Sequence, residues 1–433
     1  MATQFSVEDG KSWRAQFFTI WGGQAISLVG SMLVQFALIW YLTVETGSAT
    51  VLALASMAGM LPQVLLGPFA GTLVDRWNRR VVLLIADSSI ALATILLAAL
   101  FAFDAIAVWH IYMLMFLRSL GGSFHFNAMS ASTSLMVPIE HLTRIQGVNQ
   151  MLNGGLNVIS APLGALLLTI MPIENILLID VGSALFAIIP LFFIPIPQPE
   201  RSGKPFELGA ERESVWQDFK VGLRYVISWP GLLIIGLMAV LINFVLAPAF
   251  SLLPLLVKDY FGGGVIQLGW VESAFGVGVI VGGAILGAWG GFKRRILTSF
   301  FGLFGIGIGA FLLGLAPSSL LMLAIVGSLI IGLMMPMVNG PIFAVMQSTV
   351  APDLQARVMS LMGSVSAGAA PIGLAIAGPV SDFIGIQIWF VISGFVCISL
   401  AVTGLAIPAV MNIEADRSAS TASSDEELAA PIH

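Results

Sequence analysis

Four ionisable side chains lie inside long apolar segments, and their types could do chemistry there. They are Asp87, Arg118, Asp180 and Glu272. A charge inside a bilayer costs about 2.5 to 3.5 kcal/mol on insertion scales, so each of these residues needs a compensating role. A carboxylate in a medium of low dielectric constant binds a proton more readily than in water. We therefore assign Glu272, Asp87, Arg118 and Asp180 to proton coupling.

Each of these residues also has a structural interpretation. Asp87 and Asp180 lie about two turns from a helix end, and either could be a structural hydrogen-bond acceptor. Glu272 is the stronger candidate for carrying a proton. Arg118 lies near the middle of its segment, and since a guanidinium keeps its charge, it needs carboxylates or backbone carbonyls as partners.

Uncharged polar side chains occur in the same segments and could line a substrate cavity. One segment carries asparagines at every fourth residue, a spacing that places them on one helix face, where they could instead bind a neighbouring helix. The full set expected at the cavity is Gln24, Gln35, Asn149, Asn153, Asn157, Asn243, Asn339 and Gln347. Because the chain has 28 Phe, 10 Trp and 19 Met, the cavity would suit a bulky, mainly apolar ligand.

No motif indicates an enzyme or a cofactor. The four histidines are too scattered for a metal site, and the single cysteine, Cys397, allows neither a cysteine metal site nor an internal disulfide. Glycine-rich runs lie in apolar segments, where small residues indicate close helix packing. We expect no catalytic residue, metal or cofactor, and no basic face is left over for nucleic acid.

The segments that must position these residues would cross a membrane. The chain has 433 residues, of which 58% are hydrophobic, and its mean hydropathy of +0.98 indicates a polytopic membrane protein. About 20 apolar residues span a bilayer. Twelve such runs lie near residues 17–43, 48–73, 80–103, 107–127, 145–170, 173–195, 230–256, 265–290, 294–315, 318–346, 355–380 and 384–409. The expected fold is an all-α membrane protein with two pseudo-symmetric six-helix bundles.

Lysine and arginine positions predict the orientation. With twelve crossings, 16 of the 18 basic residues fall on the same side as the N-terminus. Lys258 falls on the other side and Arg118 within the membrane. Because basic residues are retained in the cytoplasm, both termini are expected to be cytoplasmic.

The most polar stretch divides the chain into two halves. We expect an N-terminal bundle over 1–196, a cytoplasmic linker with an amphipathic helix over 197–229, a C-terminal bundle over 230–410, and a disordered cytoplasmic tail over 411–433. The halves resemble each other at an offset of a little over 200 residues, since Arg79-Arg80 is echoed by Arg294-Arg295. Such a repeat is typical of transporters built by duplication, with the substrate between the halves.

A compact charged segment joins the second and third apolar runs. Arginines there would resist translocation, and Asp75 could face the positive N-terminal end of another helix. An alternative is a solvated turn that only sets topology. We assign conformational gating to Gly71, Asp75, Arg76, Arg79, Arg80 and Arg357.

Three motifs resemble those of the major facilitator superfamily, and the resemblance covers essentially the whole chain. Gly71-x-Leu73-x-Asp75-Arg76-x-x-Arg79-Arg80 is similar to the family signature between helices 2 and 3, and Arg118-Ser119-Leu120-Gly121-Gly122 to the helix 4 motif implicated in proton coupling. Ala161-Pro162-Leu163-Gly164-Ala165 is a weaker likeness of the antiporter motif. Its residues Pro162 and Gly164 have counterparts in Pro371 and Gly373.

Further stretches resemble the macrolide-efflux (Mef-type) branch of that family. They are residues 20–27, 45–49 and 118–125, Glu272, and residues 357–361. The resemblance implies a monomeric antiporter of the bacterial cytoplasmic membrane that exports hydrophobic drugs in exchange for protons. Two departures are the missing acid near Asn127 at the end of helix 4 and the alanines in the antiporter motif. The alternatives are an exporter of a native metabolite such as a siderophore or lipid-like compound, an importer, and a non-transporting membrane receptor.

Overall fold

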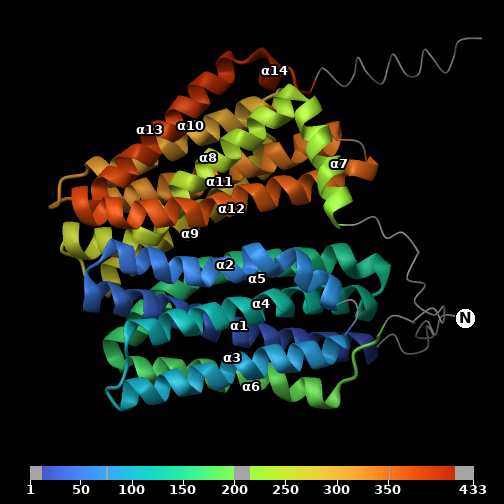
Figure 1. The fold of residues 1–433 in the computed structure, drawn as a ribbon, viewed down its shortest axis with the longest axis vertical. Helices are drawn as coiled ribbons and strands as arrows, with labels where there is room; N and C mark the ends of the chain where they lie inside the picture. Colours follow the sequence, from blue (N-terminus) through green and yellow to red (C-terminus); the bar gives the residue numbers. More distant parts are fainter. Residues whose placement is uncertain (1–11, 75–76, 199–214, 351, 415–433) are drawn as a thin grey trace, which may run out of the picture. The chain divides into compact units, whose positions relative to one another are not determined.

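The computed structural model describes residues 12–74, 77–198, 215–350 and 352–414, and the regular structure within these ranges is helical (Figure 1). Twelve of the helices have 21 residues or more. In chain order they are α1 (Ser12–Thr46), α2 (Ala49–Val74), α3 (Arg79–Ala102), α4 (Val108–Met136), α5 (Ile139–Ile170), α6 (Ile173–Phe193), α8 (Pro230–Leu255), α9 (Val265–Trp289), α10 (Arg295–Leu315), α11 (Leu321–Thr349), α12 (Pro352–Ile384) and α13 (Ile386–Ala406). Shorter elements are α7 (Val215–Ser228), the π-helix η2 (Leu256–Tyr260) and α14 (Pro408–Met411).

Eleven helices among the described residues are long and apolar enough to cross a membrane. The remaining long helix, α4, has 29 residues, but its lower hydropathy reflects polar side chains such as His110, Arg118, His125 and Asn127. Its length is sufficient for a crossing, because 29 residues of helix extend about 44 Å. The chain is therefore an all-helical, multi-pass membrane protein, as its hydropathy predicts.

Prolines and glycines mark several helix boundaries. Proline is the first residue of α8 and α12 and the residue before α5 and α6, where its missing N–H costs no intrahelical hydrogen bond. Gly47 follows α1 with φ of 58°, and Gly262 follows η2 with φ of 63°. These two residues are 215 positions apart, as are Arg80 and Arg295, so the repeat seen in the sequence is also present in local backbone conformation.

The structure divides into two compact units. The first unit lies within residues 1–208 and includes 251–273, and the second lies within 209–250 and 274–433. In the first unit α3 packs on both α4 and α6, and in the second unit α10 packs on both α11 and α13. Each of these helices is the third long helix of its half and contacts the fourth and the sixth. The repeat therefore extends to helix packing.

Glycines allow several of these helices to approach at backbone distance. A methyl group at Gly23 of α1 would lie 2.0 Å from the backbone oxygen of Phe186 in α6. In the second unit, a methyl group at Gly282 of α9 would lie 2.1 Å from the backbone oxygen of Leu333 in α11. The glycine-rich apolar runs are thus packing surfaces, as their positions in the sequence indicate.

Candidate functional site

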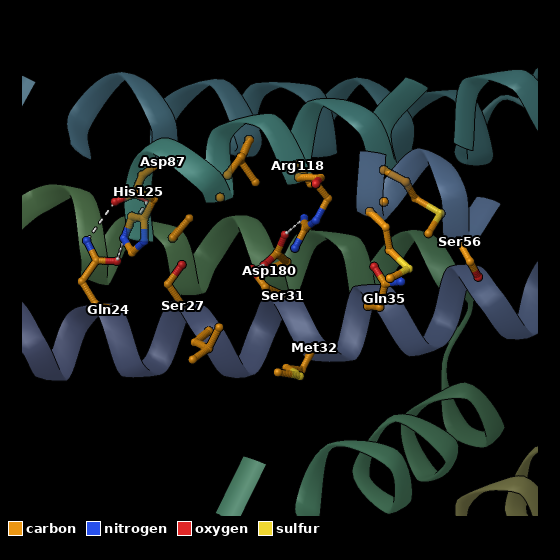
Figure 2. A pocket seen from close by; sticks show the side chains of 18 of the residues that line it. Gln24, Ser27, Ser31, Met32, Gln35, Ser56, Asp87, Arg118, His125 and Asp180 are labelled. Atoms are coloured by element: carbon orange, nitrogen blue, oxygen red, sulfur yellow. Dashed lines mark hydrogen bonds and ion pairs between the residues drawn. The ribbon is translucent and has the colours of Figure 1, made fainter. Parts of the chain in front are cut away.

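The first unit contains a cavity of about 500 Å³ that holds three of the four ionisable residues singled out by the sequence. Figure 2 shows Asp87, Arg118 and Asp180 at this cavity, together with polar side chains of α1. Helices α1, α2, α3, α4 and α6 supply nearly all of the lining, and Ser251 of α8 completes it. The cavity thus combines charged groups with apolar side chains such as Met32, which is the composition of a ligand site.

Arg118 and Asp180 form a buried ion pair that connects α4 to α6 (Figure 2). Arg118 Nη1 lies 2.6 Å from Asp180 Oδ2, and the aspartate side chain is 3% exposed. Thr94 of α3 accepts a hydrogen bond from Arg118 Nη1 at 3.1 Å, and Ser31 of α1 donates to Asp180 Oδ1 at 3.2 Å. Arg118 therefore has the carboxylate partner that a buried guanidinium requires.

A second polar group contains Asp87, Gln24 and His125 (Figure 2). Gln24 Nε2 donates to Asp87 Oδ2 at 2.9 Å, and Gln24 Oε1 accepts from His125 Nε2 at 2.8 Å. His125 Nε2 also lies 3.6 Å from Asp87 Oδ1. The glutamine side chain thus bridges a carboxylate and an imidazole inside the unit.

The two polar groups lie two helical turns apart on three helices. Ser31 follows Gln24 by seven residues on α1, and Thr94 follows Asp87 by seven on α3. On α4, which runs in the opposite direction, Arg118 precedes His125 by seven. Because seven residues return nearly to the same helix face, with a rise of about 10.5 Å, the side chains form two layers along one wall. We call Gln24, Asp87 and His125 the histidine layer, and Ser31, Thr94, Arg118 and Asp180 the arginine layer.

Glu272 lies apart from this cavity. It belongs to the part of α9 that groups with the first unit, and it is half-buried. One turn earlier, a methyl group at Gly269 would lie 3.0 Å from Ala165 Cβ of α5, so this turn of α9 packs on the segment with the antiporter motif. Glu272 has neither a hydrogen bond nor an ion pair with any residue in the described ranges.

The uncharged polar residues that the sequence assigns to a single substrate cavity do not lie together in the structure. Gln24 and Gln35 line the cavity of the first unit. Asn243 and Asn339 line a separate cavity of about 310 Å³ in the second unit, which also contains Met238. Asn149, Asn153 and Gln347 are not among the residues that line either of these two cavities.

The asparagine stripe of α5 divides along its length. Asn149 Oδ1 accepts from Trp21 Nε1 at 2.7 Å, which agrees with the packing interpretation. Asn153 is exposed, and the side chain of Asn157 lies outside what the structure describes. Gln347, near the end of α11, is exposed.

Two gating residues of the signature segment attach the start of α3 to its neighbours. Arg79 Nη1 donates to the backbone oxygen of Ala131 in α4 at 3.1 Å. The Arg80 guanidinium donates to the backbone oxygens of Leu191 and Phe192 at the end of α6. Basic groups are favourable at carbonyl ends of helices. These arginines therefore contribute to packing within the first unit as well as to charge asymmetry.

Of the other residues assigned to gating, Gly71 and Arg357 lie on helices of the described structure. Gly71 of α2 faces Asn127 of α4, since a methyl group there would lie 3.4 Å from Asn127 Oδ1. Asp75 and Arg76 lie outside the described residues. Arg357 lies on α12, the helix against which α7 packs.

In the second half, the turn between α9 and α10 has glycine where the turn between α2 and α3 has Asp75. Gly290 and Gly291 have φ of 78° and 82°, a backbone region that side chains other than glycine rarely adopt. Arg295 Nη1 donates to Ser348 Oγ at 3.2 Å and thus connects α10 to α11. The turn keeps an arginine contact between neighbouring helices, and the offset of 215 residues places Gly290 where the first half has Asp75.

Both copies of the antiporter motif place a glycine where two helices meet. A methyl group at Gly164 of α5 would lie 2.7 Å from Phe36 Cδ1 of α1, and one at Gly373 of α12 would lie 2.1 Å from the backbone oxygen of Phe244 in α8. Pro162 and Pro371 lie inside α5 and α12. The glycines allow the fifth helix of each half to contact the first.

Sequence reasoning missed His125 as a site residue and did not foresee the hydroxyl groups of the arginine layer. Scattered histidines in a sequence give no metal-site signal, and the described residues contain no group of three potential metal ligands. The informative signal was the spacing of seven between Arg118 and His125, matched on α1 and α3.

Long apolar helices in two repeated sets, with charged residues buried in a cavity, are typical of secondary transporters. The profile of the Major Facilitator Superfamily matches residues 20–374 and 232–430. The chain belongs to the major facilitator superfamily. This membership confirms that it is a transporter protein and not an enzyme.

Relatives that cover 76% to 92% of the chain agree with the branch indicated by the sequence. Macrolide efflux protein A of Streptococcus pyogenes is 36% identical over 400 residues, covering 92% of this chain and 96% of that protein. Macrolide efflux protein A of Enterococcus faecalis is 34% identical over 332 residues, covering 76% and 100%. The multidrug efflux pump Tap of Mycolicibacterium fortuitum is 25% identical over 401 residues, covering 89% and 94%.

Solved structures support the fold. A mutant of the nucleoside transporter NupG superposes with a TM-score of 0.70 at 13% identity, covering 91% of this chain and 99% of that one. A bacterial homologue of the human lysosomal transporter Spinster gives a TM-score of 0.68 at 14% identity, covering 94% and 98%. At these identities the likeness concerns the fold alone.

Proposed function

We propose that this chain exports bulky, mainly apolar drugs such as macrolide antibiotics across the bacterial cytoplasmic membrane in exchange for protons. The observation that carries the proposal is a cavity of about 500 Å³ with buried ionisable side chains, in a chain 36% identical to macrolide efflux protein A. An ionisable group of the cavity would bind the proton and the apolar lining would contact the drug. No cofactor is needed for this exchange.

The proton gradient supplies enough free energy for such export. One proton moving down about 100 mV gains roughly 2.3 kcal/mol, and one pH unit adds about 1.4 kcal/mol. Together these correspond to a drug gradient of about 500-fold. Exchange of a single proton would therefore suffice for resistance.

Alternating access would couple the inward movement of protons to the outward movement of the drug. In this proposal the half over 1–196 rocks against the half over 230–410, with both termini in the cytoplasm. Asp75 would bind the positive N-terminal end of the helix that begins near Pro352 when the cytoplasmic side is closed. The arginines of the signature segment would position that aspartate.

The test is accumulation of a labelled macrolide in bacteria that lack their own exporters. Cells that contain the protein should accumulate less label than cells with an empty vector, and a protonophore should abolish the difference. Immunodetection in the membrane fraction controls for expression. If the protein is present and accumulation equals that of the vector control, macrolide export is refuted, and native metabolites become the next substrates to assay.

A further inference from the structure

We propose that Asp87 and His125, bridged by Gln24, form the proton-binding site, whereas the Arg118–Asp180 pair keeps a fixed charge. This inference rests on the proposed exchange of drug for protons. It assigns the titrating unit to the histidine layer, in which an aspartate and an imidazole share one glutamine (Figure 2). It also gives the arginine layer a structural role.

Two donors, Arg118 and Ser31, contact the carboxylate of Asp180. Arg118 lies at 2.6 Å, Ser31 donates at 3.2 Å, and the Thr94 hydroxyl lies 3.4 Å from Asp180 Oδ2. Because a guanidinium does not release its proton in a protein and Arg118 contacts Asp180 directly, we assign this pair a fixed structural role and not proton carriage.

The histidine layer differs because both charged partners can exchange protons. The Gln24 amide nitrogen can only donate, so it fixes Asp87 Oδ2 as an acceptor, and its oxygen can only accept, so it fixes His125 Nε2 as a donor. His125 Nδ1 has no hydrogen-bond partner among the residues that the structure describes. A proton bound at Nδ1 converts the imidazole to imidazolium and changes the charge of the layer from −1 to 0. Its release returns the imidazole to neutral and the layer to −1.

Outside the histidine layer, no unpaired charged group of the described cavity lining offsets the change in net charge when His125 binds or releases a proton. The other charged groups at the cavity are Asp87 on α3, Arg118 on α4 and Asp180 on α6, and α1 and α2 contribute only uncharged side chains to its described lining. Arg118 and Asp180 neutralise each other about 10.5 Å away along the helices. The His125 side chain is 25% exposed, so a proton can reach it from the cavity.

The experiment uses the purified full chain in proteoliposomes and two transport assays with one labelled macrolide. Counterflow, in which internal unlabelled drug exchanges for external label, requires no net proton movement and reports a folded, mobile protein. Uphill transport is driven by an imposed pH gradient of about one unit, which supports roughly tenfold accumulation if one proton is exchanged. The variants are His125→Gln and Asp87→Asn, with His141→Gln as the matched histidine control. His141 stacks on Trp13 and does not line the cavity.

We expect His125→Gln and Asp87→Asn to lose the gradient-driven accumulation, while counterflow, with a changed apparent affinity for the drug, remains measurable. His141→Gln should retain both activities. Gln24→Ala should shift the pH dependence of uphill transport, because the bridge that orients the pair is gone. Asp180→Asn should still respond to the pH gradient in the fraction of protein that remains folded.

Three outcomes have separate meanings. Wild-type accumulation by His125→Gln would overturn the proton-site assignment and leave the proposed function intact. Loss of counterflow together with uphill transport in both His125→Gln and Asp87→Asn would show that the layer is structural, which also overturns the assignment. A wild-type protein that performs counterflow but ignores the pH gradient would refute proton coupling itself, and with it both proposals.

Discussion

At the scale of single residues, the buried ion pair between Arg118 and Asp180 determines how much stability is lost when either residue is replaced. Arg118 and Asp180 are 11% and 3% exposed, and they satisfy each other at 2.6 Å. Removing one partner of such a pair leaves an uncompensated charge, which costs about 3 to 5 kcal/mol, whereas removing both avoids that penalty. The pair should therefore behave as a unit in mutagenesis.

The first prediction is a double-mutant cycle on this pair. Asp180→Asn should lower the melting temperature of the purified protein by at least about 5 °C. The double variant Arg118→Gln with Asp180→Asn should be more stable than Asp180→Asn alone. Heating in detergent followed by size-exclusion chromatography measures each midpoint. Additive losses in the double variant would contradict the pairing.

At the scale of elements, α1 and α6 meet along a glycine-containing face that brings both polar layers together. A methyl group at Gly30 would lie 2.2 Å from Ser183 Oγ, and one at Gly23 would lie 2.0 Å from a backbone oxygen of α6. Ser31 and Gln24 directly follow these two glycines, so close approach of the helices also sets the position of both polar side chains. Packing and site geometry are therefore linked on α1.

The second prediction compares two adjacent glycines on that helix. Gly23→Ala should destabilise the protein by about 1 to 3 kcal/mol, because backbone atoms of α6 must move away. Gly22→Ala should be close to neutral, since no atom lies within 4 Å of its added methyl group. Yield and melting midpoint of the two variants provide the measurement. Equal behaviour of both would show that α1 and α6 do not approach in this way.

At the scale of the whole molecule, the charge distribution and the repeated packing describe a duplicated membrane protein. The same offset of 215 residues relates Gly47 to Gly262 and Arg80 to Arg295. The third helix of each half contacts the fourth and sixth within its own unit. Internal repeats of this kind are common in secondary transporters.

The third prediction concerns the orientation of the chain in the membrane. The only natural cysteine, Cys397, is fully buried, so introduced cysteines can be labelled selectively. Ala105→Cys, in the exposed turn between α3 and α4, should react with an impermeant thiol reagent in intact cells. Lys293→Cys, in the exposed turn between α9 and α10, should react only after permeabilisation. The opposite pattern would place both termini outside.

The sequence alone determined the class of molecule, the number of long helices and the repeat. Hydropathy depends on local composition, because any run of about 20 apolar residues must leave water, whatever its neighbours are. Motif spacing likewise identified the family, and the isolated charges Asp87, Arg118 and Asp180 were recognisable because charge is rare in such runs.

Only the tertiary structure decided which of these polar residues meet. Asp180 is 62 residues from Arg118, and Gln24 is 101 residues from His125, so no local rule pairs them. The same structure separated Asn243 and Asn339 from Gln24 and gave Asn149 a packing partner. Pairing depends on helix rotation and on backbone approach at glycines such as Gly23, which arise from the packing of the whole unit. The sequence therefore identifies the charged residues, whereas the packing of the helices determines which of them form pairs.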